Sequence, residues 1–119
     1  MSVLNREKLF DLAGKYEVKE VKINGDDIVF VKELNGTERD AYEASLLSQT
    51  GKDFVANMEN ARAKLLVKTV CDAKGTRLFK DTDVNAVGQL PAKLVELLFS
   101  ESQDLNKITD DDVEEAVKN

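Results

Sequence analysis

The N-terminal third of the chain alternates between apolar and polar positions in two runs that a turn separates. Residues 17–23 are Glu-Val-Lys-Glu-Val-Lys-Ile, and residues 28–34 are Ile-Val-Phe-Val-Lys-Glu-Leu. Alternation with a period of two, in β-branched and aromatic residues, is typical of strands. Residues 24–27, Asn-Gly-Asp-Asp, favour a tight turn because Asn and Gly tolerate positive φ. The pattern predicts a β-hairpin.

The remaining apolar residues recur mostly at helical spacing. Ser2 precedes one such stretch, Asp53 precedes the longest, and Pro91 suits the first turn of another. We expect helices within residues 2–14, 37–47, 53–70, 82–88, 91–99 and 109–117. The sequence therefore predicts an α+β fold that is predominantly α-helical with an N-terminal β-hairpin. A length of 119 residues indicates a single domain spanning residues 1–119.

Composition excludes several kinds of chemistry. The chain has no histidine and one cysteine, Cys71, which removes histidine-dependent catalysis, histidine-zinc sites and an internal disulfide. The formal net charge is −6, which disfavours nucleic acid and anionic membranes as partners. No pair of carboxylates stands out as an acid and a base, so we expect no catalytic residue and no cofactor. The absence of a signal-peptide pattern favours the cytoplasm.

One acidic segment resembles a calcium-binding loop at its start. A frame that begins at Asp83 places Gly88 at the sixth position, as such loops require. However, Val87, Pro91 and Leu94 then occupy the fifth, ninth and twelfth positions, where oxygen ligands belong. We therefore expect no metal site there.

Two segments carry more apolar surface than one face of an element can bury. Residues 28–31 are apolar on both faces of the predicted hairpin, and residues 94–99 are apolar nearly all around the predicted helix. Burial in the core and contact with a partner both explain this surplus. The candidate partner-binding residues are Val29 and Val31 on one face and Leu94, Val95, Leu98 and Phe99 on another.

A resemblance to a known family rests on several segments in a fixed order. These are residues 38–44, 60–67, 72–79, 81–84 and 90–91, of which the first three are Glu-Arg-Asp-Ala-Tyr-Glu-Ala, Asn-Ala-Arg-Ala-Lys-Leu-Leu-Val and Asp-Ala-Lys-Gly-Thr-Arg-Leu-Phe. Together they resemble a bacteriophage tail assembly chaperone of the long, non-contractile-tailed phage type. The resemblance covers most of residues 28–117.

The resemblance implies a non-enzymatic role in the host cell cytoplasm. Such chaperones bind and solubilise the tape measure protein, help to recruit tail tube subunits and are absent from the mature virion. The family also implies self-association into open oligomers and a longer product, made by ribosomal frameshifting, that contacts the tail tube protein. The main alternative is a permanent structural tail or head-tail adaptor subunit. An acidic mimic of DNA and an enzyme have less support in the sequence.

Overall fold

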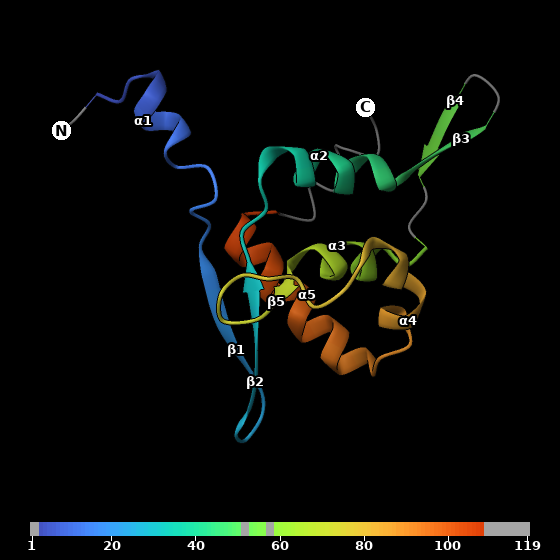
Figure 1. Cartoon of the computed structure of the whole chain (residues 1–119). Helices are drawn as coiled ribbons and strands as arrows, with labels where there is room; N and C mark the ends of the chain where they lie inside the picture. The colour runs from blue at the N-terminus through green and yellow to red at the C-terminus, as the bar shows by residue number, and fades with distance from the viewer. Residues whose placement is uncertain (1–2, 51–52, 57–58, 109–119) are drawn as a thin grey trace.

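The computed structural model describes residues 3–50, 53–56 and 59–108 of the chain and shows a mixed α+β fold (Figure 1). β1, β2 and β5 form a three-stranded antiparallel sheet in that order, and β3 and β4 form a separate two-stranded sheet. The elements are α1 (Arg6–Phe10), β1 (Val18–Asn24), β2 (Asp27–Lys32), α2 (Gly36–Ser45), β3 (Leu47–Thr50), β4 (Asp53–Ala56), α3 (Ala61–Thr69), β5 (Val70–Cys71), the 3-10 helix η1 (Asp81–Asp83), α4 (Val84–Gly88) and α5 (Ala92–Asn106). The predicted fold class is confirmed.

The predicted N-terminal hairpin is present as β1 and β2. Its register pairs Val21 with Val29, and Gly25 at the turn has a φ of 48°, a conformation that glycine adopts without a side-chain clash. β2 also pairs with β5, through Val31 and Val70. The third strand was not predicted, because its two residues continue the apolar pattern of α3.

Helix α2 begins with reciprocal hydrogen bonds between side chains and backbone. The backbone N–H of Glu38 donates to Asn35 Oδ1 at 2.7 Å, and the N–H of Asn35 donates to Glu38 Oε1 at 3.1 Å. This capping box satisfies two donors that a helix start leaves unpaired. The helix predicted within residues 37–47 is therefore present, but it begins at Gly36 and Asn35 caps it.

The long central helix expected within residues 53–70 is wrong in its first half. Asp53 and Phe54 lie in β4, Met58 lies outside the described residues, and the helix begins only at Ala61. Asn60, immediately before it, has a φ of 53°. A residue in this left-handed conformation cannot continue a right-handed helix, so α3 is confined to nine residues.

The four other helix predictions have different outcomes. The first predicted helix is shorter than expected, because α1 is capped by Asn5 rather than Ser2. Residues 81–88 form η1 and α4, and α5 follows Pro91 and continues to Asn106, so these two predictions are confirmed. The helix expected within residues 109–117 lies outside the described residues.

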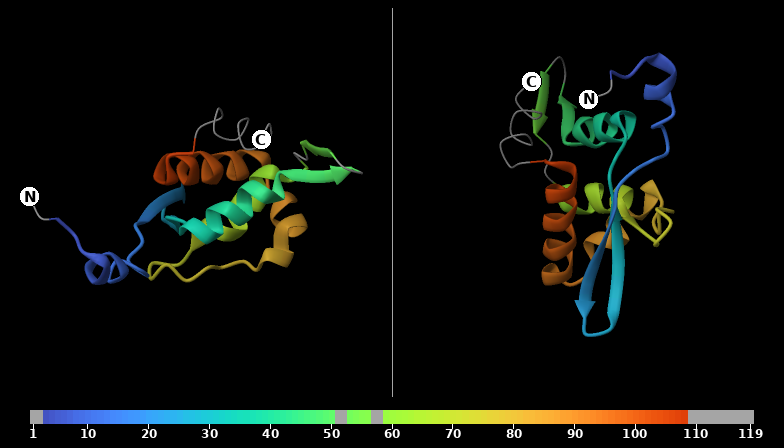
Figure 2. Two further views of the ribbon diagram at one scale, coloured as in Figure 1. Left: turned by 90° about the horizontal axis from the view of Figure 1, so that it is seen from above. Right: turned by 90° about the vertical axis from the view of Figure 1, so that its left-hand side faces the viewer.

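The main core lies between the three-stranded sheet and helices α3, α4 and α5, whose arrangement the two views of Figure 2 show. A second cluster lies under α2 and includes Tyr42, Leu65 and Ile108. Thr69 Oγ1 and Ser102 Oγ are 2.9 Å apart in a buried hydrogen bond that joins α3 to α5. The buried residues of the main core are Val21, Val31, Ala63, Leu66, Val67, Val70, Val87, Val95 and Leu98.

Candidate partner-binding groove

An open groove of about 490 Å³ lies where the first turn of α3 meets α2, the turn between α4 and α5, and the first half of α5. This volume lies within the range of cavities that bind ligands. The groove is lined by Tyr42, Asn60, Ala61, Arg62, Ala63, Gly88, Leu90, Ala92, Val95, Glu96 and Phe99.

The floor of the groove depends on a close approach of α4 to the start of α3. A Cβ atom at Gly88 would lie 2.7 Å from Asn60 Oδ1, which is closer than such atoms tolerate. Asn60 Nδ2 also donates to Asn85 Oδ1 at 3.1 Å. Pro91, with a φ of −52°, then leads the chain into α5. Glycine at position 88 therefore allows the contact that shapes the groove.

The groove combines an apolar lining with one charge of each sign. The Arg62 guanidinium lies 5.7 Å from the centre of the Phe99 ring, a cation–π contact. Glu96 is exposed on the neighbouring turn of α5. The two side chains give the groove polar positions around apolar surface, which is typical of sites that orient a bound chain.

The Tyr42 hydroxyl is a polar atom at the groove that lacks a partner. Its side chain is 1% exposed, and the hydroxyl makes no hydrogen bond with any part of the chain that the structure describes. Burial raises the pKa of Tyr42 to about 12, so the hydroxyl stays protonated and remains a donor. A buried donor without an acceptor is costly.

The structure brings the six predicted partner-binding residues into one cluster rather than two separate faces. Val95 and Phe99 line the groove. Val31 and Leu98 are 0% and 4% exposed and pack inside the main core. Each of the six belongs to the main core or packs against it: Val29, Val31, Leu94, Val95, Leu98 and Phe99.

Sequence reasoning missed Tyr42, Asn60, Arg62 and Gly88 as groove residues. Tyr42 was placed in a helix, but its neighbours across the groove are far away in the sequence. The pairing of Gly88 with Pro91 was the available signal, because a glycine and a proline between two helices indicate a tight turn.

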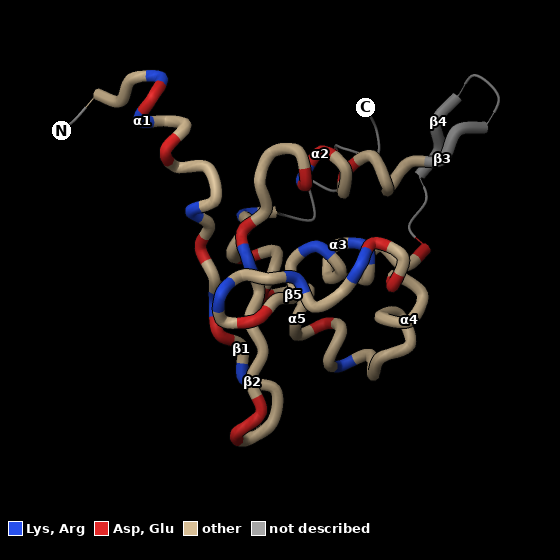
Figure 3. Tube along the Cα trace, in the orientation of Figure 1, with Lys and Arg blue, Asp and Glu red and all other residues tan. Residues whose placement is uncertain are grey.

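Figure 3 shows acidic and basic positions interspersed along the described trace. The described residues contain no group of three or more His, Cys, Asp or Glu side chains placed to hold a metal ion. Among the helices that the structure describes, none has the length and apolar character needed to cross a membrane.

Comparison with models of known protein families gives a match. The family model described as phage tail assembly chaperone matches residues 11–119. The chain belongs to the phage tail assembly chaperone family. The matched range contains every residue that lines the groove, whereas α1 precedes it. We found no match among curated proteins or among solved structures.

Proposed function

We propose that this chaperone binds helical, apolar segments of the tape measure protein in the groove and keeps that protein soluble. The observation that carries the proposal is the open groove with the unpartnered Tyr42 hydroxyl, in a chain of the tail assembly chaperone family. A groove of about 490 Å³ accommodates a few apolar side chains from one face of a helix. Helices that lie in grooves are bound in this way through side chains one turn apart.

Different residues of the groove make different kinds of contact with the client. Phe99 and Val95 offer apolar contact, Arg62 and Glu96 select for charge at the rim, and Tyr42 donates a hydrogen bond to the client. Of the other predicted contact residues, Val29, Val31, Leu94 and Leu98 support this surface from within or beside the core.

Membership of the family and the negative net charge of the chain support a wider role in tail assembly. The whole chain acts as one non-enzymatic domain in the host cytoplasm, and its net charge of −6 keeps a partly apolar complex soluble by repulsion. Many copies bind one long client, so weak contacts add up to stable binding. Free copies self-associate, and a longer product of ribosomal frameshifting recruits the tail tube protein. The chaperone leaves before the virion is complete.

Co-expression with the tape measure protein tests the proposal. The tape measure protein becomes soluble and co-elutes with the wild-type chain in size-exclusion chromatography. Ala92→Trp fills the groove from an exposed position and abolishes co-elution. Leu78→Trp, at a position that is 53% exposed and outside the groove, retains it.

The alternative is a permanent tail or head-tail adaptor subunit. An insoluble tape measure protein beside the wild-type chain, together with detection of the chain in purified virions by mass spectrometry, would establish that alternative. Co-elution that survives Ala92→Trp would instead place the client on a different surface.

A further inference from the structure

The N-terminal arm, residues 3–15, exposes apolar side chains that no other described part of the chain buries. Every residue of the arm is exposed. Apolar side chains that gather in this way mark interaction surfaces, whereas scattered ones are ordinary. The exposed fractions are 92% for Val3, 47% for Leu4, 54% for Leu9, 63% for Phe10 and 50% for Leu12.

The arm has local structure but little to stabilise it. The backbone N–H of Lys8 donates to Asn5 Oδ1 at 2.9 Å, and the Arg6 guanidinium lies 4.8 Å from the centre of the Phe10 ring. Helix α1 has only five residues and buries none of them. Helices of this length are marginal in water. A surface that covers Leu9 and Phe10 would therefore also stabilise the helix.

The arm joins the body of the protein at the end of the molecule away from the groove. Lys32 Nζ, at the end of β2, lies 5.2 Å from the centre of the Tyr16 ring. β2 pairs with β5, which follows the last residue of α3, whereas the groove lies at the first turn of α3. α1 stands apart from the other helices in Figure 1 and in the left view of Figure 2.

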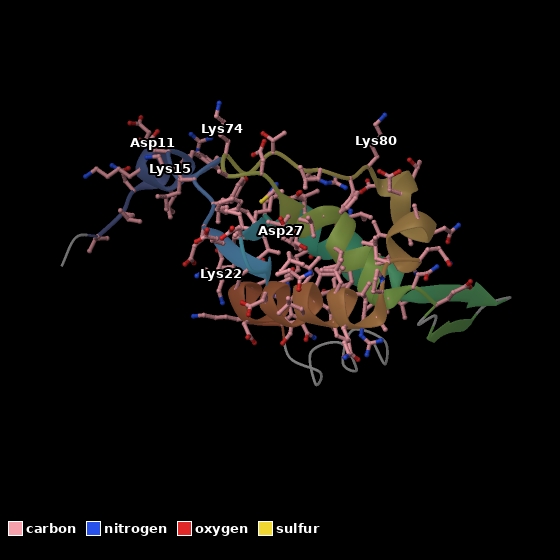
Figure 4. All side chains as sticks on the ribbon, turned by 90° about the horizontal axis from the view of Figure 1, so that it is seen from below. Asp11, Lys15, Lys22, Asp27, Lys74 and Lys80 are labelled. Carbon is pink, nitrogen blue, oxygen red and sulfur yellow. The ribbon has the colours of Figure 1, made fainter. Side chains whose placement is uncertain are left out.

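The side chains of the arm show the same separation in Figure 4. Asp11 and Lys15 lie near Lys74 at one end of the molecule, and Lys80 lies at the other end, toward α4. α4 contributes Gly88 to the groove. In this conformation the arm thus points away from its own groove, while the groove of a second copy is open to it.

We propose that, in the free chaperone, the N-terminal arm of one copy docks in the groove of a second copy, which is the same groove that the function proposed above gives to the client. The arm supplies Leu9, Phe10 and Leu12 as apolar side chains, and the groove offers Leu90 and Phe99.

Charge supports a second copy as the occupant. The arm has three basic and two acidic side chains, although the chain as a whole has a net charge of −6. The arm is therefore slightly basic whereas the rest of the chain is acidic, and its approach to another copy is favourable. Arm and groove are different surfaces, so the contact is heterologous and each copy can bind two neighbours.

Sedimentation velocity with complementary variants tests the contact without any client, so the result is independent of tape measure binding. The arm variant Leu9→Asp/Phe10→Asp and the groove variant Ala92→Trp each weaken self-association about tenfold or more. Leu78→Asp, at a position exposed to nearly the same extent as Leu9 (53% against 54%), is the matched control and associates like the wild type. Circular dichroism verifies that each variant is folded. If Ala92→Trp unfolds, Glu96→Trp, at another exposed groove position, takes its place.

Mixing the two variants gives the decisive result. The intact arm of the groove variant meets the intact groove of the arm variant, so an equal mixture forms pairs and nothing larger. A wild-type chain that stays monomeric as its concentration rises would overturn the proposal. A mixture that stays monomeric while the wild type associates would also overturn it, because the arm then binds its own groove or another surface.

Discussion

Leu98→Ala removes a buried side chain of α5 from the main core. Leu98 is 4% exposed and belongs to the main core. The substitution removes three carbon atoms, and at about 0.8 kcal/mol each the lost transfer energy is about 2.4 kcal/mol. The cavity that remains adds to this loss. We expect the free energy of unfolding to fall by about 3 to 4 kcal/mol.

Leu94→Ala is the matched control for this prediction. Leu94 lies one turn earlier on α5 and is only partly buried, so the same exchange changes helix propensity equally and costs about 1 to 2 kcal/mol. Urea denaturation followed by circular dichroism measures both losses. A loss for Leu98→Ala no larger than that for Leu94→Ala would refute the assignment of Leu98 to the core. If client binding fell while stability stayed intact, Leu98 would be a contact residue instead.

Three further substitutions test other features of the fold by the same denaturation assay. Thr69→Val lowers the free energy of unfolding by about 1 to 3 kcal/mol, because it leaves the buried Ser102 hydroxyl without its partner. Ser102→Ala costs less, because the Thr69 hydroxyl still donates to the Leu65 carbonyl. Equal losses for the two variants would contradict this account. Asn35→Ala removes the cap of α2 and costs about 1 kcal/mol, and an unchanged urea midpoint would show that the cap is dispensable. The hydrogen bond from Arg77 lowers the pKa of Asp81 from its ordinary value of 3.8. The ionised Asp81 carboxylate therefore stabilises the folded protein above pH 3.8, and this stabilisation is lost as the pH falls through the lowered pKa. The difference in stability between the wild type and Asp81→Asn therefore shrinks in acid, and a difference that stays constant with pH would contradict it.

Local signals were sufficient for the hairpin and for the start of α5. Alternation around residues 24–27 defined β1 and β2, and Pro91 marked the start of α5. β5 could not be predicted, because its pairing with β2 joins residues about forty positions apart. The β3–β4 pairing was missed because the apolar residues from Phe54 onward also fit helical spacing. Asn60 is of a residue type that tolerates positive φ, but a single asparagine does not mark the end of a periodic pattern.

The groove was predictable only where it coincides with the apolar helix α5. That pattern identified Val95 and Phe99, which line the groove. The remainder of the groove depends on tertiary contacts, such as the approach of Gly88 to Asn60 and the burial of Tyr42 without a hydrogen-bond partner among the described residues. A periodic pattern shows how apolar a face is, but it does not show whether that face is covered.

The most direct test of client binding in the groove is an NMR titration of the labelled chain with helical fragments of the tape measure protein. Backbone amide signals report contact residue by residue. The account predicts that the largest shifts occur at residues 60–63, 88–92 and 96–99, which form the groove, and that Ala92→Trp suppresses them. Shifts confined to the β1–β2 hairpin, or no shifts with any fragment, would contradict it.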